Sequence, residues 1–184
     1  MTRPNRTLVF TTFFALAVVS VAVLVSMSDA DPPPGQACLQ TPFRGITETS
    51  ELGELIGFVD PLDWGCVGGD AGGSARTLGV PVPPPPSGIC LHPPGPNPST
   101  GAVRLRLTLG EARHVSLVMH GQAMRGGPRE VFPVRTLLDA DLQVGEYEVI
   151  WDAKNDAGER VPPGIYRAVM EAGADVLCGD IEIR

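Results

Sequence analysis

The clearest chemistry in this sequence belongs to its four cysteines, Cys38, Cys66, Cys90 and Cys178. In an exported chain, an even number of cysteines favours disulfides, here two bonds with three possible connectivities. A zinc site is the alternative, but no two cysteines have CxxC spacing, and Cys90-Leu91-His92 is a lone CxH. Proximity in the sequence favours a Cys38–Cys66 bond. The remaining pair, Cys90–Cys178, would then tie the region before the main domain to its last strand.

The histidines and the first pair of aspartates do not have the spacing of a metal site. His114 and His120 fall on the outward face of one expected strand. At about 3.3 Å per residue they are about 20 Å apart, too far to share a metal. Asp60 and Asp63 supply two carboxylates, whereas calcium takes roughly 6–8 oxygen ligands.

A second group of polar residues has the composition of a calcium loop: Asp152, Asn155, Asp156 and Glu159. The order fails, because Lys154 stands at the third position and Ala157 stands where glycine is required. No GxSxG motif supplies a serine nucleophile. We therefore expect a protein that is not an enzyme and that needs no metal and no cofactor.

The first 30 residues have the composition of an export signal. Arg3 and Arg6 precede an uncharged, mostly apolar run at 7–27, and Ser28-Asp29-Ala30 offers small residues at the two positions that a signal peptidase reads. Cleavage would leave Asp31 at the N-terminus. The alternative is an uncleaved membrane anchor, since the run is near the ~18-residue length of a membrane-spanning helix. Either way we expect the rest to be extracellular, at the cell surface or in the periplasm.

The composition after the signal changes twice. Residues 31–80 form a short segment with little expected regular structure, tied by disulfides, and residues 81–100 form a proline-rich linker of polyproline type. Residues 101–184 are expected to form the folded domain. The formal net charge of −7 argues against a nucleic-acid partner, which would need a basic face.

Alternation of apolar and polar residues dominates the last domain. Val103–Leu109, Glu146–Trp151 and Val176–Ile183 each place every second side chain inward. Glu130–Arg135 is a short strand whose Pro133 favours a sheet edge. About six or seven short strands separated by turn signals predict an all-β fold, an immunoglobulin-like or fibronectin-III-like β-sandwich.

The spacing of residues around Trp151, at the end of the expected strand Glu146–Trp151, is characteristic. The positions in this pattern, expected to be structural, are Gly145, Trp151, Asp152, Asp156, Gly158, Val161, Gly164 and Tyr166. The pattern resembles the immunoglobulin-like domain of the hook-capping (FlgD-like) family and the related C-terminal sorting domain of type IX secretion cargo, over roughly the last half of the chain. We expect Asp156-Ala157-Gly158 to be the turn of a hairpin between the strands on either side.

The C-terminal residues also resemble the last strand of sorting domains. This likeness makes Ile181, Ile183 and Arg184 candidates for sorting or contact, although Asp180 and Glu182 depart from the usual basic residues. We further expect the last strand to be the sheet edge that accepts a partner's strand.

These observations lead to an exported, non-catalytic protein whose C-terminal domain serves secretion sorting, cell-surface attachment or assembly. The expected partner is a protein of the secretion or surface machinery. One alternative is a membrane-anchored periplasmic or surface binding protein, which touches the membrane only through an uncleaved N-terminal segment. The other is a hook-cap-like assembly scaffold, a role that the export signal disfavours.

Overall fold

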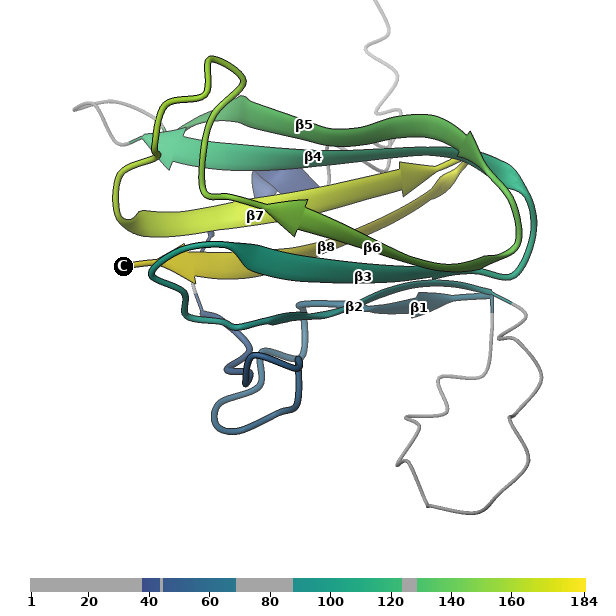
Figure 1. The fold of residues 1–184 in the computed structure, drawn as a ribbon, viewed down its shortest axis with the longest axis horizontal. Helices are drawn as coiled ribbons and strands as arrows, with labels where there is room; N and C mark the ends of the chain where they lie inside the picture. The colour runs from purple at the N-terminus through teal and green to yellow at the C-terminus, as the bar shows by residue number, and fades with distance from the viewer. Residues whose placement is uncertain (1–37, 44, 69–87, 124–128) are drawn as a thin grey trace, which may run out of the picture. The chain divides into compact units, whose positions relative to one another are not determined.

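Alternating apolar side chains build two antiparallel four-stranded sheets, which pack face to face as a β-sandwich (Figure 1). The computed structural model describes residues 38–43, 45–68, 88–123 and 129–184, so the expected signal at 1–30 lies outside the described residues. One sheet has the order β1-β2-β3-β6 and the other β5-β4-β7-β8. The strands are β1 (Gly65–Val67), β2 (Ile89–Gly95), β3 (Val103–Leu109), β4 (Arg113–Ala123), β5 (Glu130–Leu142), β6 (Gly145–Trp151), β7 (Gly164–Ala172) and β8 (Asp175–Ile183).

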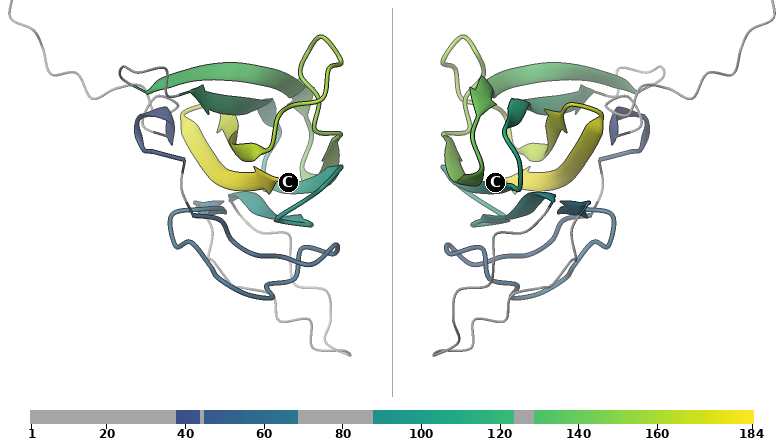
Figure 2. Two further views of the ribbon diagram at one scale, coloured as in Figure 1. Left: turned by 90° about the vertical axis from the view of Figure 1, so that its left-hand side faces the viewer. Right: turned by 90° about the vertical axis from the view of Figure 1, so that its right-hand side faces the viewer.

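The core lies between the two sheets, as the end-on views of Figure 2 show. The inward residues of β3 are Val103, Leu105, Leu107 and Leu109, and all four are fully buried. Residues of β4, β7 and β8 face them from the other sheet. Burying this much apolar surface supplies most of the driving force for folding, at about 25 cal/mol per Å².

Trp151 and Tyr166 join the two sheets through the core. Their rings meet edge to face, with centroids 5.3 Å apart, and the Trp151 indole N–H donates to the Lys154 carbonyl at 2.9 Å. Trp151 has no exposed surface. The prediction that Trp151 is a core residue is confirmed. Its ring is buried among apolar side chains, and its indole N–H has a hydrogen-bond acceptor within the protein.

The expected hairpin between β6 and β7 is wrong, because the two strands belong to different sheets. Their connection crosses the sandwich, and the turn at Asp156-Ala157-Gly158 closes a small hairpin inside that connection. Asn155 N–H donates to the Glu159 carbonyl at 2.9 Å and Val161 N–H donates to the Ala153 carbonyl at 2.9 Å. The predicted turn therefore forms, but it does not join β6 and β7 as a hairpin.

The sandwich begins earlier in the chain than residue 101. Within the region expected to be a linker, β2 pairs with β1 on one side and with β3 on the other. Pro93 and Pro94 are tolerated because they lie at a register irregularity between His92 and Gly95, where the ladder is interrupted. The remainder of the expected linker, residues 81–87, lies outside the described residues.

Strand β5 is longer than predicted. We expected it to end at Arg135, but it continues to Leu142 and includes Leu137 and Leu138. The prediction that this strand lies at an edge is confirmed by the sheet order. Pro133 sits next to a register shift in the ladder with β4, which again explains how a proline fits there.

Both disulfides form, but not in the expected pairs. Cys66 and Cys90 are directly opposite each other on β1 and β2, with Cα atoms 4.1 Å apart. Cys38, in a helical turn at 38–40, bonds to Cys178 of β8, with Cα atoms 6.3 Å apart. The expected pairing failed because it treated Cys90 as part of a linker, whereas Cys90 lies inside a sheet. Two intramolecular disulfides are compatible with an oxidising extracellular or periplasmic environment.

No helix within the described residues is long and apolar enough to span a membrane.

Candidate functional site

The residues of the FlgD-like pattern come together around the connection between β6 and β7. Val161 and Tyr166 are buried with Trp151 in the core. Asp152 lies 3.2 Å from the Lys154 ammonium, and the Asp156 carboxylate accepts a hydrogen bond from the Thr136 N–H at 3.3 Å.

The glycines of this pattern serve the backbone. Gly158 has φ +80° in its turn, and Gly145 has φ +154° where β6 begins, values that residues with a side chain rarely adopt. Gly164 is the first residue of β7. The pattern therefore describes packing and turns.

The three C-terminal candidates differ in accessibility. Ile181 and Ile183 are buried in the core, with 0% and 2% exposure. Neither side chain can therefore touch a partner while the domain is folded. Arg184 is exposed, and its Nε donates to the Glu182 carboxylate at 2.8 Å. Only Arg184 among the three remains available as a contact.

The outer edge of β8 is occupied within its own chain along the middle of the strand, at Cys178 and Asp180. Trp64 N–H donates to the Cys178 carbonyl at 2.9 Å, and Asp180 N–H donates to the Asp63 carboxylate at 3.1 Å. The Asn97 side-chain amide donates to the Asp180 carbonyl at 2.9 Å. These bonds use the backbone groups that a docking strand would need.

The second half of this edge is filled in the same way. Glu182 N–H donates to the Asn97 side-chain oxygen at 2.9 Å. Ser99 N–H donates to the Glu182 carbonyl at 2.8 Å, and Arg184 N–H donates to the Ser99 carbonyl at 2.8 Å. From Cys178 to Arg184, the edge of β8 that we expected to accept a partner's strand is therefore already covered by residues 63–64 and 97–99.

A buried ionic cluster anchors the N-terminal segment 38–43 to the outward face of β7 and β8. Arg167 and Asp180 form a two-pronged ion pair, at 2.6 and 2.7 Å, in which both side chains are almost fully buried. The same guanidinium donates to the carbonyls of Cys38, Thr41 and Pro42. Because Arg167 saturates so many acceptors, the buried pair leaves few polar groups unsatisfied.

Asp63 approaches this cluster with an unusual protonation state. Burial, followed by the nearby carboxylates of Asp180 and Asp60, raises its pKa from 3.8 to about 8, while the Asp180 N–H and the Arg167 charge oppose the rise. Its Oδ1 accepts from Asp180 N–H, and its Oδ2 has no hydrogen-bond partner among the described residues. Asp63 is therefore a proton-binding group close to neutral pH.

The histidines have three different surroundings. The exposed imidazole of His114 contacts the carboxylates of Asp141 at 3.0 Å and Asp139 at 2.9 Å, whose hydrogen bonds raise its pKa. Burial lowers the pKa values of His92 and His120. Of the two histidines expected on an outward strand face, His114 is exposed and His120 is partly buried. Among the described residues no cluster of three or more potential ligands is placed to hold a metal.

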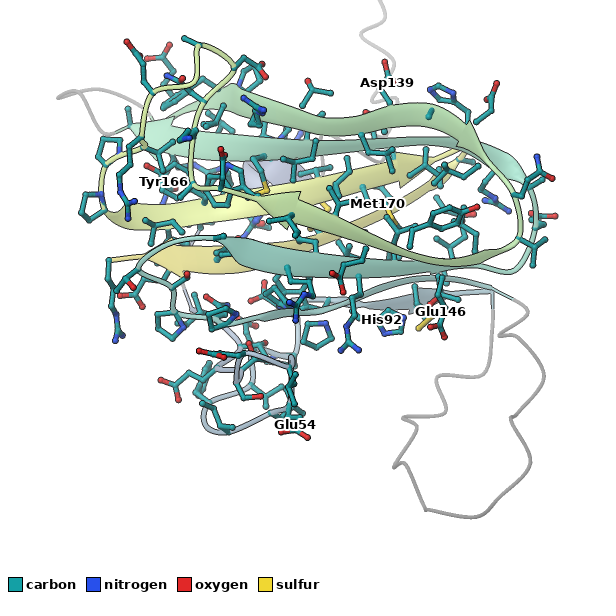
Figure 3. The ribbon with its side chains drawn as sticks, in the orientation of Figure 1. Glu54, His92, Asp139, Glu146, Tyr166 and Met170 are labelled. Carbon is teal, nitrogen blue, oxygen red and sulfur yellow. A yellow bond between two sulfur atoms is a disulfide. The ribbon has the colours of Figure 1, made fainter. Side chains whose placement is uncertain are left out.

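The most unusual surface is a loop that exposes large apolar side chains. We call residues 48–62 the apolar loop. This loop precedes β1 in the chain and projects from the side of β1 and β2 that faces away from β3 (Figure 1). Figure 3 shows Glu54 at the far end of the loop. Its exposed apolar residues are Leu52 (66%), Leu55 (57%), Ile56 (68%), Phe58 (61%), Val59 (46%) and Leu62 (82%). Exposed apolar clusters of this kind mark interaction sites in soluble proteins.

A groove opens at another part of the sandwich. It has a volume of about 1140 Å³, and its walls come from segment 38–43, the first residues of β5 and β7, and the end of the β6–β7 connection. Most of its apolar wall consists of aromatic rings and prolines: Phe43, Phe132, Pro133, Pro162, Pro163 and Tyr166. Arg129, Arg160 and Glu159 supply the charges around it.

Comparison with protein-family models, with curated proteins and with solved structures found no match to this chain.

Sequence reasoning missed both surfaces. The run Leu55-Ile56-Gly57-Phe58 lies in a segment where we expected little regular structure, and apolar residues normally indicate burial. The available signal was the three glutamates that closely precede this run, Glu48, Glu51 and Glu54, because a charged approach is hard to reconcile with a buried core. The groove is formed by side chains from distant parts of the chain, so no local sequence pattern predicts it.

Proposed function

We propose that this protein is an exported, non-catalytic protein that acts by binding another protein through its apolar loop. The observation that carries the proposal is the group of six exposed large apolar side chains on one ordered loop. The disulfides support the exported location, because such bonds persist in oxidising compartments. Surface attachment and assembly are the roles that such a contact serves, and the resemblance to FlgD-like domains agrees with them.

The carboxylates of the loop narrow the type of partner. Glu51, Glu54 and Asp60 lie among its apolar residues, and the whole chain has a formal net charge of −7. An anionic membrane surface would repel this loop. A protein surface with an apolar depression and basic residues at its rim would complement it.

The proposal is tested with a double substitution, Ile56→Ser with Phe58→Ser, in cells that export the native chain. Both side chains are mostly exposed, so the variant should fold. We expect it to lose retention at the cell surface and to be released to the medium. The matched control is Ile150→Ser, which changes an equally exposed residue (60%) of β6 outside the loop and should be retained.

Two outcomes would count against the proposal. Full retention of the folded double variant would exclude the loop as the contact. Release of an Arg184→Glu variant, with retention of the loop variant, would instead favour sorting through the C-terminus. Arg184 is suited to this comparison because its side chain is exposed and its hydrogen bonds go to the neighbouring Glu182.

A further inference from the structure

The apolar loop is held in a fixed conformation. Glu48 N–H donates to the Phe58 carbonyl at 2.7 Å, and Ile56 N–H donates to the Glu48 carbonyl at 3.1 Å. The Glu48 carboxylate also accepts from Phe58 N–H at 2.9 Å, while the Ser50 hydroxyl accepts from Glu54 N–H at 3.2 Å. A loop that is ordered before binding loses little conformational entropy when it binds.

The groove is an apolar hollow that could accept the side chains of the apolar loop. Its volume of about 1140 Å³ slightly exceeds the ~300–1,000 Å³ of small-molecule pockets, so it has room for several side chains together. Its shape depends on close packing of Phe132 over Gly121, where an added Cβ would lie 2.9 Å from two ring carbons. An apolar hollow of this size suits a protruding group of aliphatic and aromatic side chains.

The charges of the two surfaces are opposite. The exposed Glu51 and Glu54 belong to the apolar loop. The groove carries Arg129, whose guanidinium lies 5.5 Å from the Phe43 ring, and Arg160, with Glu159 as the only acid among its described lining residues. Such complementarity fixes the orientation of an encounter more than it adds affinity.

The two surfaces cannot meet within one copy. The apolar loop lies beyond the β1–β2 edge of one sheet, whereas the groove is formed by the first residues of β5 and β7 in the other sheet. Figure 3 shows Glu54 of the loop and Tyr166 of the groove on opposite sides of the β2–β3 layer. Each copy of the protein therefore exposes both an apolar loop and a groove, and neither surface is occupied by the other within the same copy.

We propose that the apolar loop of one copy binds in the groove of a second copy, so that the protein assembles head to tail. The inference rests on the proposed function, in which the loop is a protein contact, and it names the partner. Such a contact uses two different patches and therefore continues into a ring or an open chain. The net charge of −7 repels identical copies, so we expect association only at high local concentration.

The test measures molecular mass by sedimentation equilibrium on the full mature chain, from about 10 µM to about 1 mM, the range of weak protein association. The loop-defective variant is Ile56→Ser with Phe58→Ser, and the groove-defective variant is Phe132→Asp. Wild type and the control Ile150→Ser should gain mass with concentration, while each defective variant should stay monomeric.

An equimolar mixture of the two defective variants is the decisive sample. The loop variant keeps an intact groove and the groove variant keeps an intact loop, so the mixture should form one-to-one dimers and nothing larger. A symmetric interface that uses the same patch on both copies would not be restored in this way. Circular dichroism checks that the variants fold, and Arg160→Glu replaces Phe132→Asp if the latter does not.

Three results would overturn the proposal: a monomeric wild type at about 1 mM, a defective variant that still associates, or a mixture of folded variants that stays monomeric. If the loop variant is nevertheless released from cells, the loop binds a different protein. The proposed function then stands while the self-assembly fails.

Discussion

Asp63 is the residue whose ionisation should set the stability of the domain near neutral pH. The unfolded chain releases this proton near pH 4, whereas the folded chain keeps it until about pH 8. The folded state therefore binds more protons across this interval, and the free energy of unfolding must fall as the pH rises through it. Above pH 8 both states have lost the proton, and the decline from this group ends.

Replacing Asp63 by asparagine should remove this part of the pH dependence. Asparagine keeps an oxygen that can accept from Asp180 N–H, but it adds no charge beside Asp180 and Asp60. At pH 8 we expect Asp63→Asn to be more stable than wild type by about 1–2 kcal/mol, after discounting for partial solvent contact. Urea denaturation of both proteins at pH 5 and pH 8 measures the difference, and parallel pH profiles would contradict the assignment.

The sequence predicts that certain residues lie in the core, but it does not predict the environment of Asp63. Trp151 is placed in the core by strict alternation along Glu146–Trp151, a local signal that the structure confirms. Asp63 contacts Asp180, which is 117 residues further along the chain. Neither residue lies in a pattern that predicts the contact, so only the folded arrangement of β8 and the preceding segment reveals the raised pKa.

At the scale of elements, prolines caused the principal errors. Pro93 and Pro94 indicated a linker, yet β2 includes both of them. Pro133 was correctly placed inside an edge strand, but β5 runs on to Leu142, well beyond the predicted end at Arg135. In each strand a register irregularity lies beside the proline and removes the need for a ladder hydrogen bond. The alternation rule succeeded wherever one face is buried and no proline intervenes, as in β3.

Gly179 explains how one edge of the sandwich is closed. A Cβ at this position would collide with ring atoms of Trp64, which packs against the core beside β8. The absence of a side chain thus lets the segment before β1 cover the β8 edge. The sequence presents Gly179 as an ordinary strand glycine, and its role follows only from the position of Trp64.

The two disulfides should contribute unequally. Cys38–Cys178 joins residues 140 apart and Cys66–Cys90 joins residues 24 apart. On the chain-entropy model the longer loop contributes about 5 kcal/mol and the shorter about 3.4 kcal/mol, because closing a longer loop restricts the unfolded chain more. We expect Cys38→Ala with Cys178→Ala to lower the free energy of unfolding more than Cys66→Ala with Cys90→Ala.

Urea denaturation of the two double variants under identical conditions checks this order. The opposite order would mean that segment 38–43 can detach locally while the sandwich stays folded, so that its disulfide constrains little of the unfolded chain. The many acceptors that Arg167 and Arg129 bind in that segment argue for its attachment to the sandwich.

At the scale of the whole molecule, the disulfides would connect folding to the export that we propose. Cys38 bonds to a residue of the last strand, so segment 38–43 is fixed covalently only after β8 has formed and the thiols have reached an oxidising compartment. A chain that stays in a reducing cytosol would have to hold this segment by Arg167, Arg129 and Gln122 alone. We therefore expect the protein to reach its full free energy of unfolding only after export, when both disulfides have formed.

The resulting prediction compares two forms of the protein. The exported form should have an intact mass that begins at Asp31 and that lacks the four thiol hydrogens, since signal cleavage and oxidation both follow translocation. The same residues 31–184 made in a reducing cytosol should contain free thiols and should unfold at lower temperature, regaining the difference after oxidation. A mass that includes residues 1–30 would show an uncleaved anchor instead. Free thiols in the exported form would contradict the dependence of stability on export.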